Sequence, residues 1–457
     1  MRQRRTGFWG MVLGGLAALS ITTPAGAAER VIEVDSKGPG PAKFDAVSVE
    51  QIGPKQPKRV LVLMAGTAGG AGDFALVARD LVKRVPGLAV WSVDRRSQVL
   101  EDTGRFSAAL AGQISLQEMF DYYLGWITNG GTPADHFQLL DPSTVPFAQR
   151  WGMKVALQDT REVIKMADRK ARTVLLGGHS LGASLSAAYA AWDFNGRPGF
   201  RDVDGIVMID GGLLGSFDAF NKAEAAAEVA SLEGNPFLDL LGIGVPESSG
   251  LFAEAGAIFA LRDPGGDGAV LRDYPLLPAE FKPPVQATNQ ANLGYAFDRD
   301  TSPPGLALLH VNAGGLAAAG DPRDWADGGV TPVQNLAQTF GREPVNSVEW
   351  YFPRRLTIDT NGANAMKRNA VARYLGLRLT HTNQIDVPIY AFQTDLTDGA
   401  VLAGARALVK RAKTGSTDVM LVDGDPRYSH LDPLTAAPAK NKFAKTVSKF
   451  IRRASKR

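Results

Sequence analysis

The sequence contains no cysteine among its 457 residues. Disulfide bonds, a cysteine nucleophile and a thiolate metal site are therefore excluded, and the fold must be held together by its packed core. An excess of charge of one sign is also lacking, because 50 Lys and Arg oppose 47 Asp and Glu. Outside one N-terminal stretch, no apolar run is long enough to span a bilayer. The remaining composition, 45% hydrophobic and 21% charged, is that of a folded globular protein.

Residues 1–28 have the pattern of a cleaved signal peptide. Three arginines precede a short apolar stretch at 8–21, which glycines interrupt, and small residues of the cleavage-site kind follow at 24–28. The shortness of the apolar stretch favours a signal peptide over a membrane anchor. We therefore expect an exported protein, periplasmic or secreted. Without those arginines the two charge signs balance at 47 each, which gives no attraction to nucleic acid.

The C-terminus is locally basic, with eight Lys and Arg and no acidic residue between 440 and 457. Phe443, Val447, Phe450 and Ile451 form one apolar helical stripe within it. The favoured interpretation is a last helix that packs on the fold and exposes its basic face. Docking on an anionic membrane surface is the alternative.

Short apolar runs bounded by turn residues alternate with amphipathic segments, which predicts a mostly parallel sheet covered by helices on both faces. The runs expected to be buried strands are 59–64, 88–93, 173–176, 205–209, 387–392 and 418–422. The expected helices of this core are 73–85, 151–169 and 181–192, with one more at the C-terminus. The fold class is therefore α/β, with a doubly wound sheet.

The alternation stops after residue 210 and resumes only near 387. A connection of that length is not expected to be structureless in a compact domain. We therefore predict a core of 29–210 and 387–457, and a mostly helical lid, 211–386, inserted between two late strands. Helices are expected within the lid at about 237–241 and 251–261.

A Gly-x-Ser-x-Gly pattern, Gly178-His179-Ser180-Leu181-Gly182, lies where a predicted buried strand meets a predicted helix. The pattern alone is weak, since a structural glycine turn would also satisfy it. A strand-to-helix turn, however, strains the central residue and exposes its hydroxyl above the sheet, while flanking side chains would collide with neighbouring backbone. Ser180 is therefore the predicted nucleophile.

A serine nucleophile needs a base, and the chain has five histidines. Only His430 lies in a loop after the last predicted strand and before the last helix, so we predict it as the base. His179 lies inside the turn and is expected to point away from Ser180. A structural role is expected for it and for the remaining three, His136, His310 and His381.

The order of strand, Gly-His-Ser-Leu-Gly, helix, insertion, acid-bearing loop and late histidine resembles the α/β-hydrolase superfamily from about Lys43 to the end, apart from the insertion. The resemblance implies a triad order of Ser, acid and His. The implied acid lies in the loop 393–399, where spacing favours Asp398 over Asp395. Asp210, after the strand that follows the nucleophile helix, is the third candidate.

The resemblance also implies two backbone donors for an oxyanion. One is the N–H of Leu181, and the other comes from the glycine-rich loop 65–70, where Thr67 is the expected donor. That loop has Ala65-Gly66 where the family commonly has His-Gly. It lacks the Gly-Lys-Ser/Thr of a phosphate-binding loop. No metal-site motif is present, and no cofactor is expected.

The sequence therefore predicts a serine hydrolase that cleaves a carboxylic ester through an acyl-enzyme. An amidase, peptidase or lactonase with the same triad, and a non-catalytic binding protein on this scaffold, are the alternatives. The expected substrate is a small apolar ester. The aromatic residues of the insertion suggest its pocket walls: Trp325, Trp350, Tyr351 and Phe352.

Overall fold

The structure is a computed structural model that describes residues 28–129, 135–342, 345, 347–424 and 426–454. The predicted signal peptide lies outside the described residues except for Ala28, so it stays a prediction. Within the described part, none of the helices combines the length and the apolar character that crossing a bilayer would need.

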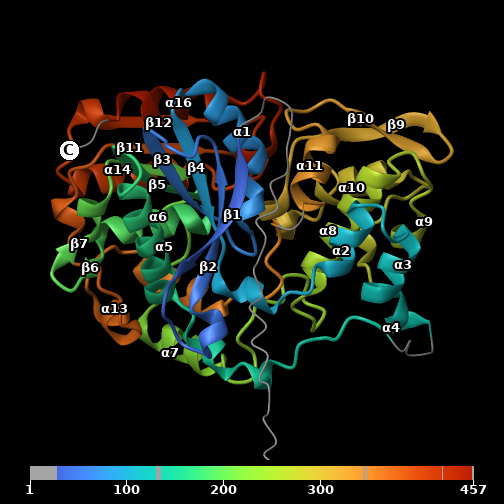
Figure 1. Cartoon of the computed structure of the whole chain (residues 1–457), viewed down its shortest axis with the longest axis horizontal. Coiled ribbons are helices and arrows are strands. Elements are labelled where there is room, and N and C mark those ends of the chain that lie inside the picture. Colours follow the sequence, from blue (N-terminus) through green and yellow to red (C-terminus); the bar gives the residue numbers. More distant parts are fainter. Residues whose placement is uncertain (1–27, 130–134, 343–344, 346, 425, 455–457) are drawn as a thin grey trace, which may run out of the picture.

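An eight-stranded sheet forms the centre of the molecule, in the order β1-β2-β4-β3-β5-β8-β11-β12 (Figure 1). β1 pairs with β2, and β2 with β4, antiparallel, while the remaining pairs are parallel. The strands are β1 (Glu29–Asp35), β2 (Ala46–Ile52), β3 (Arg59–Met64), β4 (Leu88–Val93), β5 (Thr173–His179), β8 (Ile206–Ile209), β11 (Ile389–Gln393) and β12 (Val419–Asp423).

All six predicted strands are present, within three residues of their expected bounds. The continuous apolar runs of β3, β4, β5 and β8 are buried along nearly their whole length, as strands covered on both faces must be. The sequence did not predict the β1–β2 ribbon. β1 lies at the sheet edge and, apart from the buried Val34, carries exposed and half-buried side chains, so it lacks an apolar run.

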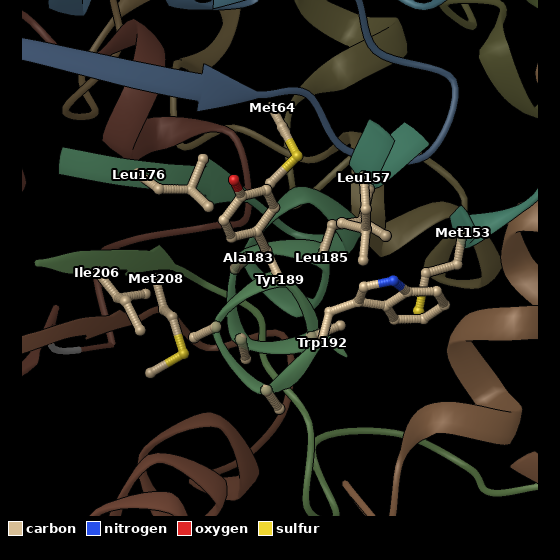
Figure 2. Packing of buried hydrophobic residues seen from close by; sticks show 14 of the residues in the cluster. Met64, Met153, Leu157, Leu176, Ala183, Leu185, Tyr189, Trp192, Ile206 and Met208 are labelled. Atoms are coloured by element: carbon tan, nitrogen blue, oxygen red, sulfur yellow. The ribbon is translucent and has the colours of Figure 1, made fainter. Parts of the chain in front are cut away.

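Helices cover both faces of this sheet, which confirms the doubly wound α/β class. α1 (Ala75–Arg84) and α16 (Lys442–Arg453) share one apolar cluster with one face. α5 (Met153–Asp168), α6 (Leu181–Ala191) and α14 (Ala400–Arg411) pack against the other. Figure 2 shows Ala183, Leu185 and Tyr189 of α6 gathered with side chains of the sheet. This packing holds the start of α6 at the carboxyl edge of β5.

The C-terminal helix α16 packs as the sequence predicts. Phe443, Val447, Phe450 and Ile451 are buried against the sheet, and Lys445 and Lys449 are among its exposed cations. Contact of that basic face with a membrane stays a prediction.

The segment 211–386 connects β8 to β11, which are neighbours in the sheet. Helices make up most of its regular structure, and one unpredicted hairpin accompanies them. Its elements are α7 (Lys222–Ala230), α8 (Ser248–Arg262), α9 (Ala269–Arg272), α10 (Asn289–Phe297), β9 (Gly314–Gly320), β10 (Arg323–Asp327), α11 (Val333–Phe340), α12 (Arg354–Ala363) and α13 (Ala370–Leu375). The helix expected at 237–241 is wrong, because Phe237 forms an extended bridge with Pro353 there.

Packing divides the chain differently from the predicted boundaries. α12 and α13 belong to the core cluster of α5 and α6. In contrast, the helices α2 (Gly104–Leu110) and α3 (Leu116–Phe120), which fall within 29–210, pack on α8 in a cluster outside the sheet. Figure 1 shows α2 and α3 beside α8, α9 and α10, away from the sheet. Short elements complete the fold: α4 (Trp126–Thr128), β6 (Asp193–Phe194), β7 (Arg197–Pro198) and α15 (Asp432–Thr435).

Candidate active site

Ser180 stands alone between β5, which ends at His179, and α6, which begins at Leu181. Its backbone is in the left-handed half of conformational space, with φ 56° and ψ −121°. Such a conformation in a residue with a side chain costs about 1–3 kcal/mol and persists only where the surroundings enforce it. The predicted strained turn is therefore present.

The glycines of the turn are required by close backbone approach. A Cβ on Gly178 would lie 2.3 Å from the carbonyl carbon of Gly182, and one on Gly182 would lie 2.0 Å from the Met64 carbonyl oxygen. A third glycine, Gly211 after β8, would place a Cβ 2.0 Å from the Ser180 carbonyl oxygen. The backbone of α6 and of the neighbouring strand ends therefore lies too close to the turn for a residue with a side chain to replace these glycines.

His430 and Asp210 meet at the carboxyl edge of the sheet. The Nδ1 atom of His430 lies 2.5 Å from Oδ2 of Asp210, and both residues are buried. Thr394 supports the carboxylate, donating from its backbone N–H at 2.7 Å and from its hydroxyl. Burial raises the pKa of Asp210, but the hydrogen bond and charge of His430, with the Thr394 bonds, outweigh it and leave that pKa below its ordinary value.

Asp210 is therefore the acid that the structure brings to His430, and the expectation that Asp398 does so is corrected. Asp398 is exposed in the turn before α14, with φ 45°. Asp395 points outward and pairs with Arg299 at 2.9 Å. The loop after β11 contributes only Thr394 to this contact. Thr394 donates to the carboxylate of Asp210, which follows the adjacent strand β8.

A signal for Asp210 was present in the sequence. Asp210 follows directly on a buried strand and precedes Gly211-Gly212, just as the serine turn combines a strand end with glycines. Asp210 also adopts a left-handed conformation, with φ 46°.

The loop after β3 lies against Ser180. A Cβ on Gly66 would lie 3.0 Å from the Cβ of Ser180, and Thr67 is half-buried beside it in the same cavity. The N–H of Leu181, the residue after the serine, belongs to the first turn of α6, whose donors have no acceptor within the helix. Both predicted oxyanion donors thus belong to segments that meet at Ser180, and their role stays a prediction.

His179 packs against His430 instead of bonding to the serine. Its Nε2 lies 2.9 Å from the His430 carbonyl oxygen, and the two rings are 4.3 Å apart. Burial, followed by the charge of His430, lowers the pKa of His179 to about 3. Because a carbonyl only accepts, the neutral ring of His179 carries its hydrogen on Nε2 and donates it there.

A second contact secures the His430 loop to the insertion. Asp432 accepts from the backbone N–H of Ser429 at 2.7 Å and from the Thr331 hydroxyl at 2.6 Å. Leu431 also donates its N–H to the His310 carbonyl oxygen at 3.0 Å. The His430 loop is therefore held by contacts with the insertion.

Ser180, His430 and Thr67 open into one cavity that encloses about 1110 Å³ of empty space, part of it open to solvent. Its far walls come from the insertion and are almost entirely apolar. They include Phe252, Leu271, Leu277, Phe281, Leu293 and Phe297.

The aromatic residues expected to wall this pocket do not line it. Trp325, Trp350, Tyr351 and Phe352 are all buried in hydrophobic clusters. Periodicity could not separate them from pocket residues, because both kinds of position are shielded from bulk water.

The remaining histidines lie elsewhere in the described chain. His136 stacks on Trp126, and His381 lies 3.8 Å from a carboxylate oxygen of Asp193. His310 contacts the Pro303 carbonyl oxygen at 3.2 Å. The described residues contain no group of three His, Asp or Glu arranged to hold a metal ion.

Comparison with known proteins identifies the fold only through structure. No family model and no curated protein sequence matches the chain. A provisionally named lipase from Sulfolobus solfataricus superposes with a TM-score of 0.52 at 13% identity, covering 95% of this chain and 98% of that one. An epoxide hydrolase from an endophytic Streptomyces, at 11% identity, covers 94% and 96% with a TM-score of 0.44. With its strand order and its strained serine turn, the chain has the α/β-hydrolase fold.

Proposed function

We propose that this protein is a serine hydrolase of carboxylic esters. The observation that carries the proposal is the convergence of a strained serine, a histidine and a buried carboxylate at one cavity end, with Asp210 2.5 Å from His430. The pattern matches the geometric logic of a nucleophile, a base and an orienting acid.

In the proposed mechanism Ser180 attacks the ester carbonyl and His430 takes its proton. Asp210 holds the Nδ1–H of His430, which leaves Nε2 free to face the serine, and stabilises the imidazolium that forms. The N–H groups of Thr67 and Leu181 bind the oxyanion. His430 then protonates the leaving alcohol, and water activated by the same ring releases the acid.

The cavity supports an apolar substrate. Its insertion-side walls are mostly aliphatic and phenylalanine side chains, with Ser249, Arg272, Asn292 and Ser347 as the polar exceptions. An apolar acyl or alkyl group therefore contacts these insertion-side walls when its ester carbonyl lies at Ser180.

Turnover of p-nitrophenyl esters, butyrate and longer, tests the proposal. We expect Ser180→Ala to abolish turnover and labelling by a fluorophosphonate, with the same far-ultraviolet circular dichroism as wild type. Ser184→Ala, in the next turn of α6, is the matched control, because that hydroxyl only donates to the Gly212 carbonyl. Full activity in Ser180→Ala would overturn the proposal. Matched amides and lactones in the same panel decide the bond type.

We further propose that the chain is exported. The arginines, apolar stretch and small residues of 1–28 support this. Cell fractionation with N-terminal sequencing of the mature protein tests it, and an uncleaved protein retained in the cytoplasm would contradict it.

A further inference from the structure

One guanidinium group bonds to carbonyls of the loop 65–70, which carries the proposed donor Thr67 and is called the oxyanion loop below. Arg95 follows β4, and its side chain is 13% exposed. Its Nη2 donates to the carbonyl oxygens of Ala65 at 2.6 Å and Gly66 at 2.8 Å, and its Nη1 to that of Gly69 at 3.1 Å. Three peptide groups of one short loop are thus held by a single side chain.

The bond to Gly66 has a geometric consequence for the predicted oxyanion donor. The carbonyl of Gly66 and the N–H of Thr67 belong to the same peptide group, which is planar and trans, so the two point in opposite directions. With the carbonyl turned toward Arg95, the Thr67 N–H points away from it. Thr67 and Ser180 both line the cavity.

The insertion holds the guanidinium in turn. Glu349, whose side chain is fully buried, pairs with Arg95 through one carboxylate oxygen and accepts from the Ser97 hydroxyl through the other. The backbone N–H of Glu349 also donates to the Ala68 carbonyl oxygen at 2.9 Å. The oxyanion loop, Arg95 and the insertion therefore form one connected unit.

We propose that Arg95 is a positioning residue: it fixes the Gly66–Thr67 peptide group so that the Thr67 N–H points at the oxyanion, and Glu349 ties that orientation to the insertion. This inference rests on the proposed serine-hydrolase function. A planar fork of donors is required, because a lysine ammonium carries one charge centre and cannot reach carbonyls in two directions with the same geometry.

The neighbouring arginine provides a matched control. Arg96 is even more buried, with a side chain 2% exposed, and it pairs with Asp159 at 2.5 Å. It also donates to the carbonyl oxygens of Phe44 and Ser36. Arg96 thus ties together chain segments remote from Ser180, and its loss tests stability without touching the oxyanion loop.

The test compares Arg95→Lys with Arg96→Lys by steady-state kinetics on p-nitrophenyl butyrate. Since losing one oxyanion donor costs about 10²–10³-fold in rate, we expect Arg95→Lys to lower kcat by about 10–100-fold and to leave KM within about threefold. The fluorophosphonate labelling rate should fall in parallel. Arg96→Lys should keep kcat within about threefold per folded molecule, even where its Tm falls.

A second measurement separates positioning from folding. Millimolar guanidinium should restore several-fold activity to Arg95→Ala, because the ion can occupy the vacated place, but should not restore Arg96→Ala. Wild-type kcat in Arg95→Lys, or an equal kcat loss in both lysine variants, would overturn the inference while Ser180→Ala inactivity still upholds the hydrolase. Full activity in Ser180→Ala would overturn both proposals.

Discussion

The two walls of the cavity are built in different ways. The core wall is made of backbone held near strand ends, where Ala68 and Ser180 have positive φ, as does Asp210, which bonds to His430. The insertion wall is made of apolar side chains on helices such as α8 and α10. None of the described insertion residues that line the cavity is a non-glycine with positive φ. Constrained backbone thus positions the groups of the proposed reaction. The apolar side chains of the insertion determine the size and shape of the substrate pocket.

Removing the acid from the core wall should have the largest effect. We expect Asp210→Asn to lower kcat by about 10³–10⁴-fold, because an amide no longer favours the required His430 tautomer. Asp398→Asn is the matched control and should stay within about twofold of wild type, since that side chain is exposed in a turn. The kcat of both variants on an ester substrate tests this prediction. A larger loss of kcat in Asp398→Asn than in Asp210→Asn would show that the triad acid is in the loop after β11.

A substitution on the insertion wall should change substrate range and leave the chemistry intact. A Cβ on Gly256 of α8 would lie 3.7 Å from Leu293 and 3.8 Å from Leu271, so the wall has room for a side chain. Since each buried methylene contributes about 0.8 kcal/mol, Gly256→Leu should lower kcat/KM for a dodecanoate ester by about 10–100-fold. Acetate turnover should change less than about threefold. Equal losses on both esters would place the substrate elsewhere.

Two glycines of the same helix should differ in stability. A Cβ on Gly250 would lie 2.1 Å from Cδ1 of the fully buried Trp350, so Gly250→Ala should destabilise the fold by about 1–3 kcal/mol. Gly256→Ala meets only ordinary contacts and should stabilise by up to about 1 kcal/mol through helix propensity. Differential scanning calorimetry measures both, and a lower Tm for Gly256→Ala would show that the wall is already packed.

The smallest expected effect concerns a buried acid behind the core wall. Burial raises the pKa of Asp94 to about 8, and its carboxylate oxygen accepts from the Ala71 N–H. The folded chain therefore keeps a proton that the unfolded chain loses near pH 4, so stability falls as pH rises from about 4 through 8. Asp94→Asn should reduce the Tm loss between pH 6 and pH 9 by roughly 1–3 °C. Asp398→Asn is the control. A Tm loss in Asp94→Asn equal to that of the wild type and of this control would contradict the prediction.

Much of the core wall was predictable because its signals are local. The buried runs of β3, β4 and β5, the glycines around Ser180 and the late loop of His430 each follow from neighbouring residues. The carboxylate partner of His430 was not predictable, because its identity depends on which strand end lies beside His430. β8 lies next to β11 in the sheet, so Asp210 and Thr394 meet although 184 residues separate them.

The sequence by itself determined the fold class and the strained serine turn, since steric demands on a strand-to-helix turn leave a pattern of adjacent residues. It also pointed to the proposed base and the proposed oxyanion loop. Tertiary structure alone decided the acid, the cavity walls and the contact of Arg95 with Glu349, which are 254 residues apart. Those features depend on contacts between side chains that are distant in the sequence, and the periodicity of a short sequence segment carries no information about such contacts.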